Sequence, residues 1–103
     1  MKYYNSEFAD SIVAKDLRRL TNQVWKLLPM RENNEDWQKQ LSSVLIEIRG
    51  LCAMFGGQLD FLVLVSKLEG LHTAEDFMAY RTTIFSIISL LTELANYINA
   101  RES

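Results

Sequence analysis

Apolar residues recur at spacings of three and four along almost the whole chain, and no segment alternates apolar and polar residues at every second position. The first spacing is typical of one face of a helix, whereas the second would indicate a strand. The sequence therefore predicts an all-α protein, a compact antiparallel bundle of about four helices with short connections. The expected helices cover about residues 6–28, 35–55, 58–69 and 74–100 of one domain, residues 1–103.

The first expected helix has polar residues at its start and a proline at its end. Asn5 or Ser6 is expected to cap the N-terminus, and Pro29 is expected to end the helix, because proline disfavours helical geometry at the residue before it. The inward stripe comprises Phe8, Ile12, Val13, Leu17, Leu20, Val24, Leu27 and Leu28.

The second expected helix has the most regular pattern. Asn34 is the expected N-cap, and the alternating four and three spacing of its apolar residues is that of a seam between nearly parallel helices. Gly56 and Gly57 should interrupt the helix, since each glycine costs about 1 kcal/mol relative to alanine inside a helix. If they do not, the bundle has three helices. The seam comprises Trp37, Leu41, Val44, Ile48, Leu51 and Phe55.

The last expected helix starts after Gly70, where Thr73 followed by Asp76 resembles a capping box with Asp in place of Glu. Its seam comprises Phe77, Tyr80, Ile84, Ile87, Leu91, Leu94 and Ile98. No residue from Thr82 to Thr92 is charged, so this helix is expected to be buried on more than one side.

The length of the last helix leads to a prediction of self-association. It should span roughly 40 Å, whereas a domain of this size should be only about 34 Å across. Part of the helix should then overhang its own domain, and a second copy is the simplest cover because two-fold dimers are the commonest assemblies. We predict a homodimer through the third and fourth helices, with a candidate self-association face of Phe61, Leu64, Met78, Phe85 and Ile88.

Composition changes this picture little. The chain has 103 residues, 49% of them hydrophobic, and a formal net charge of -2 without any run of like charges, which argues against a dedicated nucleic-acid binder. The N-terminus lacks the apolar region of a signal peptide, and no apolar stretch is long enough to span a membrane. Cys52 has no second cysteine to pair with. These features lead us to expect a cytoplasmic protein.

The residues capable of chemistry form no catalytic or metal-binding constellation. Glu32 and Glu35 have the spacing with which helical nucleotide hydrolases bind magnesium, but they fall in a predicted loop and no second such pair follows. Cys52 is expected to be buried beside a seam, and His72 stands alone in a turn. We therefore expect no enzymatic activity, cofactor or metal.

The polar side of the first helix is the best candidate partner face. Basic residues stand there at helical spacing, and the aromatic residues near them are of the types that become interface anchors when they are exposed. The same residue types could grip phosphates and stack on bases. The candidate residues are Tyr3, Tyr4, Lys15, Arg18, Arg19, Trp25, Lys26 and Arg31.

These observations favour a non-enzymatic protein-interaction module that self-associates, such as an adaptor, an inhibitor or an immunity-type protein. Small bacterial and phage helical proteins of this size include such proteins, which is an analogy of size and fold alone. Two alternatives remain: an accessory subunit of a nucleic-acid-handling complex and a metal-dependent nucleotide hydrolase.

Overall fold

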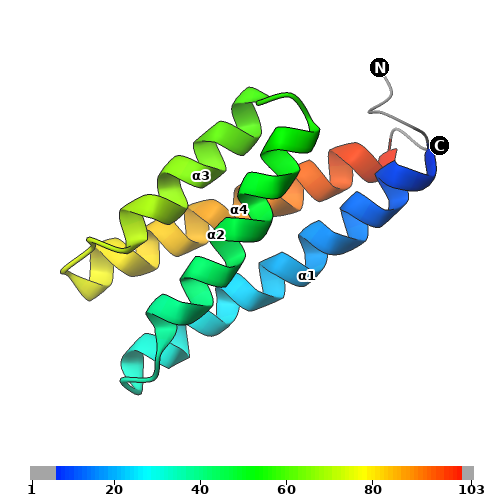
Figure 1. Cartoon of the computed structure of the whole chain (residues 1–103). Coiled ribbons are helices and arrows are strands. Elements are labelled where there is room, and N and C mark those ends of the chain that lie inside the picture. The colour runs from blue at the N-terminus through cyan, green and yellow to red at the C-terminus, as the bar shows by residue number, and fades with distance from the viewer. Residues whose placement is uncertain (1–6, 101–103) are drawn as a thin grey trace.

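Four helices make up the described chain (Figure 1). The computed structural model describes residues 7–100, and the side chains of residues 12–98. The helices are α1 (Glu7–Glu32), α2 (Trp37–Met54), α3 (Leu59–Leu71) and α4 (Phe77–Ala100), with no strand among the residues described. The all-α prediction is confirmed, with four helices rather than three. The proposed N-cap, Asn5 or Ser6, lies outside the described residues.

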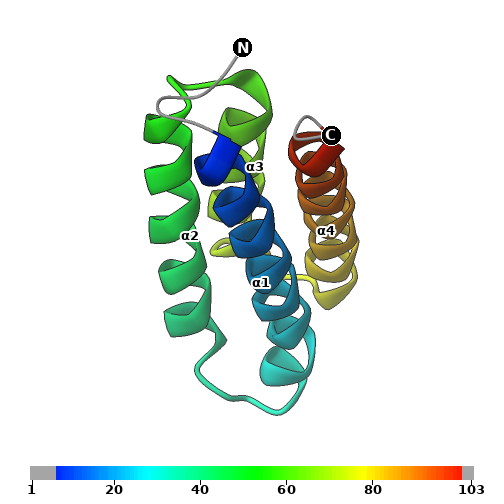
Figure 2. The ribbon, with the colours of Figure 1, turned by 90° about the vertical axis from the view of Figure 1, so that its right-hand side faces the viewer.

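The helices form an antiparallel bundle in which each packs against its neighbours in sequence, and α4 returns to pack against α1 (Figures 1 and 2). The backbones of the diagonal pairs, α1 with α3 and α2 with α4, do not approach each other closely. Between α2 and α4 the Trp37 and Tyr80 rings pack edge to face, with centroids 5.1 Å apart. The pairing of α1 with α4 is the most extensive in the bundle, because these are the two longest helices. No helix between residues 7 and 100 combines the length and the apolar character needed to cross a membrane.

The overhang expected for the last helix is wrong. The described bundle is elongated, with principal-axis extents of 41 × 20 × 19 Å. The 26 residues of α1 and the 24 residues of α4 each span most of the long axis, at about 1.5 Å per residue. Because α1 lies alongside α4, the seam of α4 from Tyr80 to Ile98 is covered within the chain itself.

The heptad seams predicted from the sequence form the core. Within the predicted stripe of α1, Ile12 is exposed and Leu28 is only partly buried, while Trp37 and Phe77 lie at the edge of the core. The seam residues that are fully buried are Leu17, Leu20, Val24, Leu27, Leu41, Val44, Ile48, Tyr80, Ile84, Ile87 and Leu91.

Pro29 does not end α1, contrary to the prediction from sequence. The helix continues to Glu32, since proline removes only its own N–H bond while its carbonyl still accepts from Asn33 N at 2.9 Å. A Schellman motif then closes the helix, with Glu35 N donating to Met30 O at 2.8 Å and Asn34 in the left-handed region at φ 57°.

The N-caps of α2 and α4 also differ from those predicted. Asp36, not Asn34, caps α2 by accepting from Lys39 N at 3.2 Å. Asp76, not Thr73, occupies the corresponding place before α4 and accepts from Met78 N at 3.2 Å. In both cases an aspartate closer to the first helical residue satisfies an N–H group that the helix leaves unpaired.

The break between α2 and α3 occurs where the two glycines predicted it. Gly56 and Gly57 have φ values of 69° and 73°, which glycine adopts without steric cost. Their N–H groups donate to Ala53 O at 3.2 Å and to Cys52 O at 2.8 Å, so a second Schellman motif ends α2.

Candidate functional site

An exposed tryptophan marks the surface along which α1 and α4 lie side by side. Trp25 is 44% exposed, and its ring packs edge to face against Phe85, with centroids 5.6 Å apart. The guanidinium carbon of Arg81 lies 4.5 Å from the centroid of the Phe85 ring, within the range of a cation–π contact. The three side chains form a ladder that links the two helices.

A shallow groove of about 310 Å³ continues this surface toward the N-terminal half of α1. Its lining is polar or small, with Arg18, Thr21 and Asn22 on α1 facing Thr92, Ala95 and Asn96 on α4. Lys15 and Lys26 lie one turn before Arg18 and one turn after Asn22. We call the surface formed by Lys15, Arg18, Asn22, Trp25, Lys26, Arg81, Phe85, Thr92 and Asn96 the α1/α4 face.

The α1/α4 face carries positive charge that the rest of the described chain does not neutralise. Lys15, Arg18, Lys26 and Arg81 are all exposed. Within residues 12–98, none of them forms an ion pair. Four uncompensated basic groups beside two aromatic rings make this surface suited to an anionic partner.

Two of the predicted partner-face arginines instead hold the bundle together. Arg19 forms ion pairs with Glu47 of α2 and with Asp16, and its hydrogen bond with Glu47 raises the pKa of the guanidinium. Its charge is therefore directed toward α2 and away from the α1/α4 face.

Arg31 is enclosed at the opposite end of α1. Its guanidinium carbon lies 4.9 Å from the ring centroid of Trp37 and 4.5 Å from that of Tyr80. One of its nitrogens donates to the carbonyl of Glu75 at 3.1 Å. Arg31 thus joins three helix ends. Of the other predicted partner-face residues, Tyr3 and Tyr4 lie outside the described part of the chain.

The structure does not bring the predicted self-association residues together on one surface. Phe61 and Leu64 are fully buried in the core, and Ile88 is buried as well. Phe85 packs against Trp25, and only Met78 is mainly exposed. Helix α3 is apolar on nearly every side, so its sequence could not indicate which residues would face inward.

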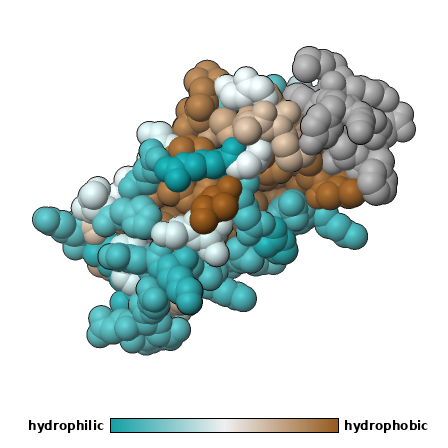
Figure 3. All heavy atoms as spheres, viewed as in Figure 1, coloured by the Kyte–Doolittle hydropathy of each residue, from teal (hydrophilic) through white to brown (hydrophobic). Residues whose placement is uncertain are grey.

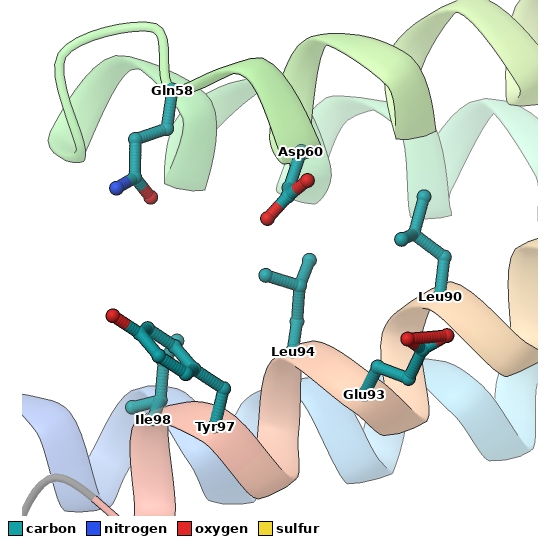
Figure 4. A pocket seen from close by; sticks show the side chains of 7 residues that line it. All are labelled: Gln58, Asp60, Leu90, Glu93, Leu94, Tyr97 and Ile98. Carbon is teal, nitrogen blue, oxygen red and sulfur yellow. The ribbon is translucent and has the colours of Figure 1, made fainter.

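Helix α3 leaves two leucines exposed, and a second hollow lies between α3 and α4. Leu59 is 72% exposed and Leu62 50% exposed, and Figure 3 shows apolar side chains gathered over the turn between α2 and α3. The hollow, of about 330 Å³, lies between the start of α3 and the second half of α4 (Figure 4). We call it the α3/α4 groove; its lining is Gln58, Asp60, Leu90, Glu93, Leu94, Tyr97 and Ile98.

The α3/α4 groove could not be identified from the sequence. Its residues come from two helices whose facing register only the fold defines, and no single motif contains them. The Arg81 and Phe85 contact was also missed, although the spacing of four residues on one helix face was a usable signal.

The residues considered for catalysis remain isolated from one another. Glu32 ends α1 and Glu35 lies in the following turn, so they do not occupy successive turns of one helix. Cys52 is buried and His72 follows the end of α3. Among the described residues, no group of three or more His, Cys, Asp or Glu side chains could hold a metal ion.

Comparison with known proteins adds no relative. No family model, curated protein or solved structure matches the chain.

Proposed function

We propose that this protein is a non-enzymatic interaction module that binds an acidic surface of a partner protein through the α1/α4 face. The single observation that supports this proposal is the half-exposed Trp25, packed on Phe85 and bordered by four basic side chains without ion-pair partners among residues 12–98. Tryptophan and arginine are the residue types that contribute most to protein interfaces.

The arrangement of this surface supports binding without catalysis. Its groove is shallow and lined by polar or small side chains, whereas sites for small molecules are usually clefts lined by large apolar and aromatic side chains. Rigid helices hold the aromatic ladder in place, so the anchor residues would lose little conformational freedom on binding. We also infer a cytoplasmic location, which the unpaired thiol of Cys52 supports.

The proposal is tested by affinity capture from a lysate of the native host after nuclease treatment. The double variant Arg18→Glu/Arg81→Glu reverses two charges of the α1/α4 face. The control Lys39→Glu/Lys67→Glu makes the same change in net charge on α2 and α3. We expect a stoichiometric protein partner to be recovered with the wild type and the control but not with the first variant. Equal recovery with all three proteins would contradict the proposal.

A nucleic-acid-handling role is the second candidate, because the same basic groups beside exposed aromatic rings could contact phosphates and bases. This role predicts that recovery of any partner depends on nucleic acid and that binding of a fluorescent oligonucleotide weakens steeply as salt increases. A partner that survives nuclease treatment would favour the protein-binding role.

A further inference from the structure

An ion pair between Arg49 of α2 and Glu69 of α3 marks the outer side of these two helices. The guanidinium of Arg49 donates to the carboxylate of Glu69, and both side chains are half-exposed. Residues three, four or seven positions apart lie on the same side of a helix. The residues at those spacings from the ion pair therefore share its side of the bundle.

Exposed apolar side chains flank the ion pair on both helices. Ile46, three residues before the arginine, is 67% exposed, and Ala53, four residues after it, is also exposed. On α3, Leu62 stands seven residues before the glutamate and Leu59 one turn earlier, and both are exposed. Leu62 is thus on the side of α3 toward α2. We call the surface formed by Ile46, Arg49, Ala53, Leu59, Leu62 and Glu69 the α2/α3 face.

The α2/α3 face carries no net charge. On α2, the neighbouring Glu47 is directed toward Arg19 of α1. On α3, Asp60 lines the α3/α4 groove, and Lys67, seven residues later, lies on the same side of the helix. Within residues 46–69, the ion pair between α2 and α3 is thus the only charge on this face, and its two members neutralise each other.

A neutral apolar surface suits a second copy of the same chain. In a two-fold dimer the same surface meets itself, so an unpaired charge within it would approach its own equivalent and repel it. The α1/α4 face would bring its own basic groups together in this way. The cores of homodimer interfaces are apolar and poor in charged residues, which is the composition of the α2/α3 face.

The bundle is large enough to dimerise through one side. Its extents of 41 and 20 Å define a side of about 800 Å², the area that each partner buries in an interface of standard size. The exposed apolar residues lie in the part of that side nearest the turn between α2 and α3, where Figure 3 shows apolar side chains gathered. Exposed apolar surface that gathers in one place marks an interaction site.

We propose that two copies of this chain associate through the α2/α3 face, about a two-fold axis parallel to the helices. This axis sets α2 of one copy against α3 of the other and keeps residues at the same height opposite one another. Arg49 of each copy then faces Glu69 of the other copy as well as its own. Leu62 of each copy lies within about one helical turn of Ala53 of the other.

Charge selects this axis over the alternative. A two-fold axis perpendicular to the helices would set α2 against α2, and no opposite charge would face either member of the ion pair across the interface. The self-association expected from the sequence is thus retained on a different surface. It does not depend on the α1/α4 proposal, because the two surfaces share no residue.

Sedimentation equilibrium of the full chain from about 1 μM to about 1 mM measures the dimer. We expect the mass to rise with concentration from that of one chain toward that of two. Leu62→Asp places a charge within the α2/α3 face and should weaken the dimer at least about tenfold. Its matched control, Met78→Asp, makes the same change at an exposed position of α4 and should leave the dimer unchanged. Circular dichroism verifies that both variants are folded.

Two charge variants test the proposed axis. Arg49→Glu and Glu69→Arg each give the face two like charges, so each variant alone should dimerise about tenfold more weakly than the wild type. When the two variants are mixed in equal amounts, opposite charges face each other across the interface again. The mixture should therefore form a mixed dimer with an affinity close to that of the wild type. A mixture that associates no better than its components would contradict this axis.

Two further results would overturn the proposal. The wild type could remain monomeric at about 1 mM, and if it then captured another protein in a way that Leu62→Asp abolishes, the occupant would be a different chain. A dimer that Met78→Asp abolishes and Leu62→Asp leaves intact would place the interface on α4 instead.

Discussion

The hydroxyl of Tyr80 donates a hydrogen bond of 2.9 Å to the backbone carbonyl of Leu27. Tyr80 is fully buried on α4, and Leu27 lies two residues before Pro29 on α1. The bond therefore ties the start of the last helix to the end of the first, at the place where proline interrupts the backbone hydrogen bonds of α1.

Tyr80→Phe should lower the free energy of unfolding by about 1 kcal/mol, because it removes the hydroxyl and keeps the packing of the ring. Urea unfolding followed by circular dichroism measures the change. Trp25→Phe, at an exposed position on the neighbouring surface, should change stability less. An unchanged midpoint in Tyr80→Phe would show that the bond does not stabilise the fold.

Stability should also fall at alkaline pH because of Tyr80. Burial raises the pKa of this phenol from 10.0 to about 12, an effect that the nearby charge of Arg31 partly opposes. Between those two values the unfolded chain loses the phenolic proton while the folded chain keeps it, so unfolding becomes more favourable as the pH rises. Below pH 10 this group makes no difference.

Urea midpoints measured at several pH values from 8 to about 12 test this expectation. The wild type should lose more stability above pH 10 than Tyr80→Phe, and the two curves should run parallel below it. Ultraviolet titration of the phenolates gives an independent reading. Parallel curves over the whole range would contradict the raised pKa.

Alanine at Gly56 or Gly57 should destabilise the protein by about 1–2 kcal/mol for each substitution, since residues with a side chain are strained at positive φ. A Cβ at either position would meet no atom within 4 Å, so backbone strain alone is being measured. Gly50→Ala is the matched control, because Gly50 lies inside α2 with equal space around it. That change should stabilise the protein by up to about 1 kcal/mol.

Arg31→Ala should lower the free energy of unfolding by about 1–2 kcal/mol, because it removes the cation–π contacts with Trp37 and Tyr80 and the hydrogen bond to Glu75. Arg31→Lys should restore only part of this loss, since an ammonium group lacks the planar surface that stacks between two rings. Lys26→Ala, at an exposed position of the same helix, serves as the control. Full recovery by lysine would show that only the charge matters.

Helical periodicity accounts for most of what could be predicted. Seam residues such as Leu41 and Ile84 are buried as expected, because the apolar face of a helix is buried whichever helix packs against it. The glycine break was predictable for a local reason, since only the backbone at Gly56 and Gly57 is involved. The prediction at Pro29 was wrong because it considered only the local preference of proline. In the structure, the N–H groups of Asn34 and Glu35 close the last turn of α1, and the side chain of Arg31 donates to the carbonyl of Glu75.

The sequence by itself determined the helices, the inward faces of α1, α2 and α4, and the turn at the paired glycines, because these follow from interactions between residues close together in the chain. Tertiary structure decided the rest. The packing of α3 against α2 and α4 buries Phe61 and Leu64 and leaves Leu59 and Leu62 exposed. The register between α1 and α4 sets Trp25 against Phe85. The packing of α1 against α2 directs Arg19 toward Glu47. These outcomes depend on which residues of distant helices lie opposite one another, and helical periodicity does not specify that arrangement.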